Sequence, residues 1–386
     1  MSSAPRPRLG GRWTPAFQPL AERFFKALVD DEALGAGLCV YQGGENVLDV
    51  YGGFADRGRT RVWDRRSVVC LFSAGKPLGA MLALAAVARG EAALDRPLGD
   101  LFPAARGTAA EALTLPALLA HRAGYPAFPE GGLRFEDLGD APKALAALLA
   151  APPAWVPGEA HGYHPRSYGT FLEAWLLAAT GMGTGPRLRR WAQDADLELF
   201  LGLDGPTQAR CVELVPGRPQ RFEPGPEARF LQALAQPGSL TQRAFAHPPA
   251  PRGYGHSDAF QRAVLPAMNL HGTAQGLAKA YTLLLEGRLG LGRELWARAL
   301  APGRQGFDPV LQRETAFGLG FMRPTGETPL GLGAGSFGHP GAGGTLAFAD
   351  LDYGLTFALV VNRQVPGAVA ASPLGQSLVQ TLRDCL

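Results

Sequence analysis

Residues 71–89 read LFSAGKPLGAMLALAAVAR, and this nearly all-apolar stretch decides the fold. Its length and composition predict a buried helix that ends at Gly90. Pro77 fixes the start of the helix, because proline lacks an N–H and is tolerated only in a first turn. We therefore expect the helix to begin at about Ser73 or Ala74, with Ser73 at its N-terminal end.

Ser73 and Lys76 are three residues apart, which on a helix places both side chains on one face. A serine hydroxyl becomes a strong nucleophile when a neighbouring base removes its proton. A lysine in apolar surroundings can be that base, because burial lowers the pKa of its amine toward neutrality. A structural interpretation is also open, in which Ser73 caps the helix and Lys76 extends its charge to solvent.

Two other stretches have residue types suited to a reaction site. Residues 155–165 read WVPGEAHGYHP and hold Tyr163 on a loop, where its hydroxyl can pass protons between a nucleophile and a leaving group; packing is the alternative. Residues 338–344 read GHPGAGG, and we expect them to open a strand. Dense glycine lets a substrate approach the backbone, and a free N–H there can stabilise an oxyanion. A tight turn before a hairpin is the alternative for this stretch.

Strand patterns occur near both ends of the chain, and the middle is mainly helical. At the N-terminal end we predict a helix at Phe17–Leu28 and a hairpin formed by Gly37–Tyr41 and Val47–Tyr51. The clearest central helices are Ala141–Leu149, Tyr168–Thr180 and Thr273–Leu285. Near the C-terminus we predict strands at Thr315–Met322, Thr345–Ala349 and Leu355–Val361 and a closing helix at Ser372–Leu382.

This order of elements predicts an α/β (α+β) fold with two domains. An antiparallel sheet flanked by terminal helices should be built from residues 1–75 and 310–386. A mainly helical domain, residues 76–309, should be inserted between them, with long loops that cover the site. The segment 204–260 is rich in Pro, Gly and Arg, and we expect it to be an ordered cover of this kind.

The composition excludes several classes of protein. Apolar residues make up 46% of the 386 residues and charged residues 18%, so the chain can bury a sizeable core. A net charge of +3 without a basic run disfavours a nucleic-acid partner. No apolar run reaches signal-peptide or membrane-span length, so we expect a cytoplasmic protein without a membrane partner. The oligomeric state is left open.

Cysteines and histidines give no sign of a metal or a cofactor. The four cysteines match no zinc pattern, and we expect Cys39 and Cys70 to be small buried residues. His161 and His164 have ligand-like spacing but no carboxylate or cysteine nearby. Ser336 lies in a sequence similar to the lipase elbow, but the helix that this elbow needs does not follow, so we interpret Ser336 as a loop residue.

Taken together, the Ser73–Lys76 pair, the Tyr163 loop and the glycine-rich stretch from His339 resemble the ordered motifs of serine β-lactamases and penicillin-binding proteins. The pattern is closest to the class C branch and its esterase relatives, the family VIII carboxylesterases. The resemblance covers about residues 35–365. Its supporting stretches are residues 47–53 (VLDVYGG), 118–124 (LLAHRAG), 155–163, 269–273 (NLHGT) and 337–344.

The resemblance implies a role for each residue of the site. Ser73 would attack the carbonyl, while Lys76 and Tyr163 would manage protons. The backbone N–H groups of Ser73 and Ala342 would form the oxyanion hole. The substrate would contact His339, Gly341, Trp155 and His164.

Two departures from the family pattern favour esters over β-lactams. Pro165 stands where class C enzymes usually have an asparagine that holds the substrate amide. His339 replaces a lysine that holds the β-lactam carboxylate, and histidine is mostly neutral at pH 7. We therefore predict a serine hydrolase that cleaves small carboxylic esters through an acyl-Ser73 intermediate. The alternatives are a β-lactamase or D-alanyl carboxypeptidase, an acyltransferase, and a non-catalytic penicillin-binding or sensor module.

Overall fold

The structure is a computed structural model that describes residues 7–218, 223–367 and 369–386. Within these residues, nine strands form one antiparallel sheet in the order β1-β3-β2-β13-β12-β11-β10-β9-β8. The strands are β1 (Arg8–Trp13), β2 (Gly35–Gln42), β3 (Glu45–Gly53), β8 (Arg304–Asp308), β9 (Arg313–Phe317), β10 (Met322–Arg323), β11 (Ser336–Pro340), β12 (Leu346–Asp350) and β13 (Leu355–Val361).

Both ends of the chain build this sheet, as the sequence predicts. The N-terminal strand β2 pairs with the C-terminal strand β13, and Leu38 lies opposite Leu359. Neighbouring residues along β2 belong to two different buried clusters, because successive side chains of a strand point to opposite faces. Leu38 and Val40 pack on the side of the terminal helices, whereas Cys39 and Tyr41 pack on the other side.

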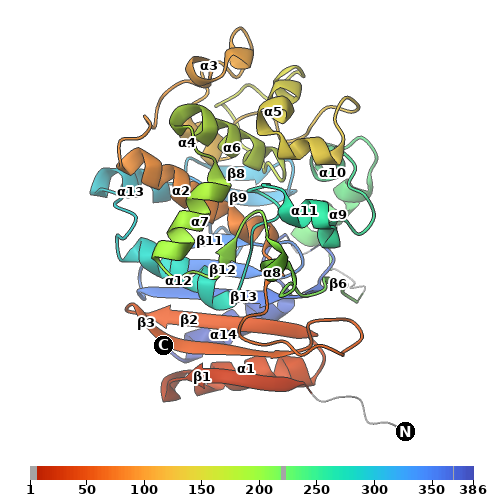
Figure 1. Ribbon diagram of the computed structural model, residues 1–386, viewed down its shortest axis with the longest axis vertical. Coiled ribbons are helices and arrows are strands. Elements are labelled where there is room, and N and C mark those ends of the chain that lie inside the picture. The colour runs from red at the N-terminus through yellow and green to blue at the C-terminus, as the bar shows by residue number, and fades with distance from the viewer. Residues whose placement is uncertain (1–6, 219–222, 368) are drawn as a thin grey trace.

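Helices cover both faces of the sheet. The terminal helices α1 (Gln18–Val29) and α14 (Pro373–Asp384) contact each other, and their apolar stripes complete the cluster on one face. Helix α12 (Ala274–Leu285) packs on the opposite face against β2, β12 and β13. Most other helices lie beyond α12, in the upper part of Figure 1.

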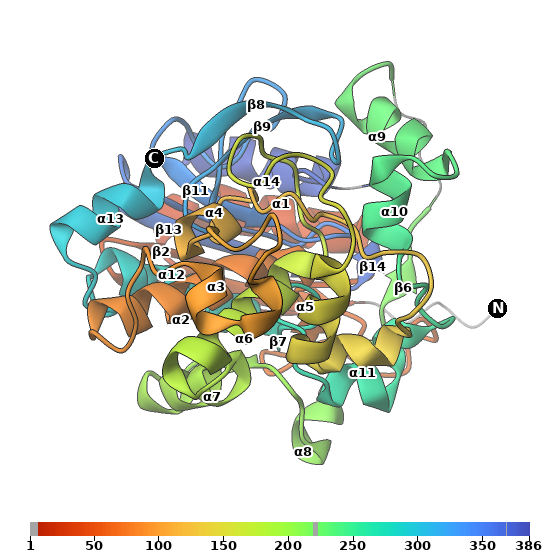
Figure 2. The same ribbon diagram turned by 90° about the horizontal axis from the view of Figure 1, so that it is seen from above.

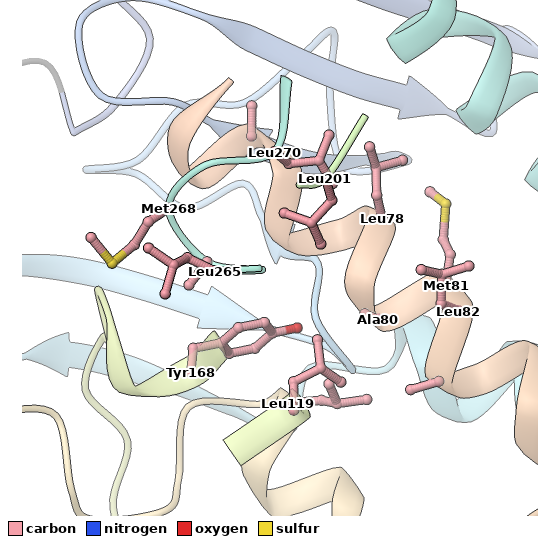
Figure 3. Close-up of a cluster of buried hydrophobic side chains, with 14 of the residues drawn as sticks. Leu78, Ala80, Met81, Leu82, Leu119, Tyr168, Leu201, Leu265, Met268 and Leu270 are labelled. Carbon is pink, nitrogen blue, oxygen red and sulfur yellow. The ribbon is translucent and has the colours of Figure 1, made fainter. Parts of the chain in front are cut away.

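The helical half is built around α2 (Lys76–Ala88), which is almost wholly buried. Figure 3 shows its side chains among apolar residues of other segments: Leu119, Tyr168, Leu201, Leu265, Met268 and Leu270. The other helices are α3 (Leu98–Leu101), α4 (Leu115–Leu119), α5 (Ala141–Leu149), α6 (Ser167–Thr180), α7 (Thr184–Asp194), α8 (Gly205–Gln208), α9 (Pro226–Ala235), α10 (Leu240–Ala246), α11 (Asp258–Arg262) and α13 (Arg293–Leu300).

Short strands join the helical half together. A three-stranded sheet has the order β4 (Val69–Cys70), β7 (His271–Gly272) and β5 (Leu199–Phe200). A parallel pair joins β6 (Val215–Pro216) to β14 (Arg363–Gln364). The segment 204–260 folds into short helices, and α9 and α10 lie together at one end of the molecule (Figure 2); its residues 219–222 lie outside the described part.

Most predicted elements are present at the expected residues, but one prediction about a strand is wrong. Thr315–Met322 is not one strand, because Gly320 has a φ of +86° and the chain turns there between β9 and β10. Residues 338–344 lead into a strand, β12, as expected, but their first part also ends β11, a strand that the sequence did not predict, and a glycine turn joins the two. Strand β8 belongs to the sheet although it lies before residue 310, where we expected the sheet domain to resume. The division into two domains stays a prediction.

Two further sequence predictions can be compared with the described residues. Ser336 is the first residue of β11 and is buried with its hydroxyl bound to Asp350, so the loop assignment is wrong. Cys39 and Cys70 are buried as expected. In the described part of the chain, no helix has both the length and the apolar character that a membrane crossing requires.

Candidate active site

Ser73 lies in a 3₁₀ turn, Phe72–Gly75, directly ahead of α2. The α-helix begins at Lys76, later than the sequence predicts, because Pro77 has no N–H to give to the Ser73 carbonyl. The Lys76 N–H binds that carbonyl instead. Residues three apart are eclipsed in a 3₁₀ turn, so Ser73 and Lys76 still share a face. Phe72 has a φ of +47°, which is strained for a non-glycine residue. The Ser73 side chain remains partly exposed to solvent.

Lys76 is fully buried, and its amine is held by three oxygen atoms. Nζ lies 3.0 Å from Ser73 Oγ, 2.9 Å from the Pro165 carbonyl and 3.0 Å from the Ala267 carbonyl. Burial lowers the pKa of this amine well below its usual value. A neutral amine has two N–H groups, which the two carbonyls accept, and one lone pair that faces the Ser73 hydroxyl. Lys76 is therefore arranged to take the Ser73 proton.

Tyr163 also contacts Ser73. Its hydroxyl lies 2.6 Å from Ser73 Oγ, and its ring lies 4.9 Å from Lys76 Nζ. The ring stacks on Phe317 of β9 and contacts Phe245 of α10, so the segment 204–260 reaches the site at this point. Burial raises the pKa of the phenol, which therefore keeps its proton and donates it to Ser73 Oγ.

The end of β11 and its glycine turn lie against the Ser73 turn. A Cβ on Gly341 would come within 2.4 Å of the Leu71 carbonyl oxygen and 3.4 Å of Ala74 Cβ, so only glycine fits there. Ala342 follows at an exposed turn, and no acceptor for its N–H occurs among the described residues. This N–H is therefore free to bind a ligand oxygen.

His339, at the end of β11, is buried beside Tyr163, with 5.6 Å between the ring centres. Its Nδ1 lies 2.6 Å from the Pro340 carbonyl, which fixes the proton on Nδ1. Burial lowers the pKa of His339 to about 3, so the ring is neutral at pH 7. Nε2 is buried without a partner among the described residues.

Trp155 and His164 lie behind the Tyr163 loop. Trp155 fills the space beside Gly162 and meets the His164 ring edge-on, with the ring centres 5.7 Å apart. His164 is buried, its Nδ1 lies 2.7 Å from the Gly162 carbonyl, and its Nε2 accepts the Tyr125 N–H at 3.3 Å. Both ring nitrogens thus bind backbone groups of the protein itself. This geometry favours a structural role for His164 over the substrate contact that the sequence predicts.

Several residues around Tyr163 were missed by the sequence analysis. His121, buried with a φ of +56°, accepts the His164 N–H on Nδ1 and the Gly162 N–H on its carbonyl. Asp308 accepts the Tyr163 N–H at 2.9 Å. Burial raises the pKa of Asp308 to about 6, despite hydrogen bonds that lower it. His121 lies in the stretch 118–124, to which the sequence assigns no role, and no local pattern marks Asp308; both residues meet the loop from distant parts of the chain.

His161 and His164 do not converge on a common point for a metal. The His161 ring binds Thr315 Oγ1 at 3.0 Å, whereas the His164 ring binds backbone groups. Across the described ranges, no cluster of three or more His, Cys, Asp or Glu side chains is arranged to hold a metal ion. The site that the structure brings together is thus Ser73, Lys76 and Tyr163, and this trio can carry out acyl transfer through the serine.

The chain belongs to the Beta-lactamase family. The family model of that description matches residues 21–379, which is most of the chain. The sheet with flanking helices and the trio at the start of α2 agree with this assignment.

Two curated proteins are similar over most of their length. "Esterase/beta-lactamase LipL" of Mycobacterium tuberculosis is 28% identical over 376 residues, covering 95% of this chain and 86% of that protein. "Esterase EstB" of Burkholderia gladioli is 27% identical over 372 residues, covering 89% of this chain and 90% of that protein. These similarities support a serine hydrolase on this fold.

Solved structures agree with the fold along the whole chain. A penicillin-binding protein homologue from Caulobacter crescentus superposes with a TM-score of 0.86 at 29% identity, covering 98% of this chain and all (100%) of that one. A family VIII carboxylesterase superposes with a TM-score of 0.85 at 25% identity and the same coverage. Hydrolases and penicillin-binding proteins therefore share this arrangement of sheet and helices.

Proposed function

We propose that this protein is a serine carboxylesterase that cleaves small carboxylic esters through an acyl-Ser73 intermediate. One observation carries the proposal: Ser73 Oγ lies between the Lys76 amine at 3.0 Å and the Tyr163 hydroxyl at 2.6 Å. A base and a proton donor beside the serine are the two groups that ester cleavage through serine requires.

In the acylation step, Ser73 Oγ attacks the ester carbonyl carbon and its proton passes to the lone pair of Lys76. The carbonyl electron pair moves onto oxygen, and we expect the backbone N–H groups of Ser73 and Ala342 to stabilise that charge. The carbon–alkoxide bond then breaks. The leaving alcohol takes the Tyr163 proton, and the Lys76 ammonium returns its proton to the phenolate.

Deacylation repeats these steps with water as the nucleophile. Water gives a proton to Lys76 as its oxygen attacks the acyl carbon, and Ser73 Oγ leaves with a proton from Tyr163. Proton return from Lys76 to Tyr163 restores the starting state. No cofactor takes part in this scheme, and every proton is held by Ser73, Lys76, Tyr163, water or the alcohol.

Two features favour an ester over a β-lactam. Pro165 offers no side-chain donor for a substrate amide, and its carbonyl is already used by Lys76. His339 is neutral and commits Nδ1 to the Pro340 carbonyl, so it offers no positive charge for a carboxylate. The names of both curated relatives include the word esterase.

β-Lactam hydrolysis is the second candidate, because the name of the LipL relative combines esterase and β-lactamase. It uses the same serine and would give the same kind of acyl-enzyme. Acyl transfer to an alcohol would also use the same three residues, with the alcohol in place of water. A non-catalytic sensor is disfavoured, because it has no need of both a base and a proton donor beside Ser73.

The proposal is tested by comparing nitrophenyl esters with a chromogenic cephalosporin on wild type and Ser73→Ala. We expect ester turnover to dominate in wild type and to be lost in the variant. Intact-mass measurement after treatment with a fluorophosphonate should give one adduct on wild type and none on the variant. Labelling that persists in Ser73→Ala would exclude Ser73 as the nucleophile, and faster cephalosporin turnover would favour the β-lactamase.

A further inference from the structure

Asp308, the last residue of β8, has a buried carboxylate that touches none of the reacting atoms but uses both of its oxygens. Oδ1 accepts the N–H groups of Val310 at 2.8 Å and Leu311 at 2.9 Å. Oδ2 accepts the N–H of Tyr163 at 2.9 Å and the hydroxyl of Thr315 at 3.2 Å. One oxygen thus organises the turn between β8 and β9, and the other holds the Tyr163 loop.

Thr315 extends this contact to a second point on the same loop. Because its hydroxyl donates to Asp308, the oxygen is free to accept from His161 Nε2, which lies 3.0 Å away. Burial lowers the pKa of His161, so the ring is neutral and Nε2 carries its proton. Two loop residues on either side of Gly162, His161 and Tyr163, are therefore bound to the β8–β9 edge of the sheet.

We propose that Asp308 and Thr315 are positioning residues that hold the Tyr163 phenol at hydrogen-bond distance from Ser73. The loop from 160 to 164 has no regular backbone hydrogen bonding, and Gly162 adds conformational freedom next to Tyr163. The Asp308 contact fixes the backbone end of Tyr163, and Ser73 meets the other end of the side chain. A shift of about 1 Å at such a contact costs on the order of 100-fold in rate. This inference rests on the proposed role of Tyr163.

A carboxylate suits this position because it only accepts hydrogen bonds, and four donors face it. The amide in Asp308→Asn would turn an NH₂ group toward N–H or O–H donors, so at least one contact with the loop or the turn would be lost. Thr315→Val removes the hydroxyl but keeps the shape of the side chain, whereas Thr315→Ser keeps the hydroxyl.

Asp350 provides a matched control, because it too is a buried aspartate at the end of a strand. It accepts the N–H groups of Asp352 at 3.0 Å and Tyr353 at 3.2 Å, and the hydroxyl of Ser336. These contacts organise the turn after β12 and involve none of Ser73, Lys76 or Tyr163. Asp350→Asn therefore measures what the loss of a buried carboxylate does to folding alone.

The experiment measures kcat and KM for a nitrophenyl ester, together with Tm, for the full chain and its variants. We expect Asp308→Asn and Thr315→Val to lower kcat by about 10- to 100-fold with KM changed less than about threefold. Thr315→Ser should restore most of kcat, and Asp350→Asn should lower Tm but keep kcat within about twofold of wild type. If Asp308→Asn does not fold, the kcat of Thr315→Val alone tests the positioning role.

Tyr163→Phe, measured in the same series, separates two kinds of failure. If it keeps wild-type kcat, the proposed role of Tyr163 is wrong. If it loses activity while folded Asp308→Asn and Thr315→Val keep kcat within about twofold of wild type, only the positioning role is overturned. Equal losses of kcat in Asp308→Asn and Asp350→Asn would also overturn it, since destabilisation would then explain both.

Discussion

The proposed role of Lys76 as a base has a cost in stability, because folding must remove its proton. Below its usual pKa of about 10.4, the unfolded chain binds a proton on Lys76 that the folded protein does not. The free energy of unfolding therefore rises with pH. For Lys76→Met this linkage is absent, so the free energy of unfolding of wild type should rise with pH relative to that of the variant, by at most about 1.4 kcal/mol per pH unit, as the pH approaches the usual lysine pKa from below.

Denaturant titrations of wild type and Lys76→Met at several pH values measure this difference. The same variant should lose on the order of 10²- to 10⁴-fold in kcat, because the base is removed. A stability difference that does not change with pH would mean that Lys76 stays protonated in the folded protein and cannot take the Ser73 proton.

Tyr163→Phe keeps the ring that stacks on Phe317 and removes only the hydroxyl at Ser73. We expect kcat to fall by about 100-fold, since the proton donor to the leaving group is gone. Tm should change little, because the lost hydrogen bond joins two side chains at a partly exposed site. Stopped-flow measurement with a nitrophenyl ester would show whether acylation or deacylation is slowed more. Unchanged rates for both steps would leave Tyr163 without a chemical role.

At this scale, the sequence predicts the side chains that react but not those that hold them. Ser73 and Lys76 are neighbours along the chain, and Tyr163 belongs to a recognisable motif. The Pro165 and Ala267 carbonyls that bind Lys76 have no sequence signature, because every residue has a carbonyl. Asp308 meets Tyr163 across 145 residues, and a single sequence contains no signal of such a pairing.

At the scale of elements, the turn after β11 controls how closely the sheet approaches the nucleophile. Gly341→Ala would add a Cβ 2.4 Å from the Leu71 carbonyl oxygen, so the turn or the start of the Ser73 segment must move. Because the Ala342 N–H moves with this turn, we expect kcat to fall by about 10- to 100-fold. Ester kinetics measured alongside Tm test this expectation.

Gly333→Ala is the control for this prediction, since nothing lies within 4 Å of its added Cβ. It should leave kcat within about twofold of wild type, as surface substitutions usually do. If Gly341→Ala behaved in the same way, the close contact between the β11 turn and the Ser73 turn would have no bearing on catalysis.

Long elements with a clear period were predictable, and short or interrupted ones were not. Helix α5 and strand β13 have the predicted residues, because their apolar spacing has no competing signal. The strand predicted at 315–322 fails at Gly320, where a left-handed backbone turns the chain. Strands β4, β5 and β7 have two residues each, too few for any alternation to be recognised.

For the whole molecule, the pairing of β2 with β13 should make the sheet unfold as one unit. Leu359 is fully buried opposite Leu38, and Leu359→Ala should lower the free energy of unfolding by about 2–5 kcal/mol. Leu351→Ala, at an exposed turn residue, should change it by less than about 0.5 kcal/mol. Both variants are unfolded with denaturant, and each transition is monitored by circular dichroism and by the loss of esterase activity.

Coincident transitions from both probes are expected for Leu359→Ala. Loss of activity well before loss of the sheet would show that the helical half and the sheet unfold separately.

The architecture itself was predictable from the placement of strand patterns near both ends of the chain. The strand order was not, because the sequence contains no direct record of which strands are neighbours.

The central position of β2 has a consequence for synthesis of the protein. Gly35, at the start of β2, bonds to Asn362 across 327 residues. The hairpin of β2 and β3 leaves the ribosome long before its partner β13 is translated. One edge of this apolar hairpin therefore stays unpaired while the segment between β3 and β13 is synthesised, when exposed strand edges favour aggregation. Chaperones that bind nascent chains should find their main target in residues 35–53.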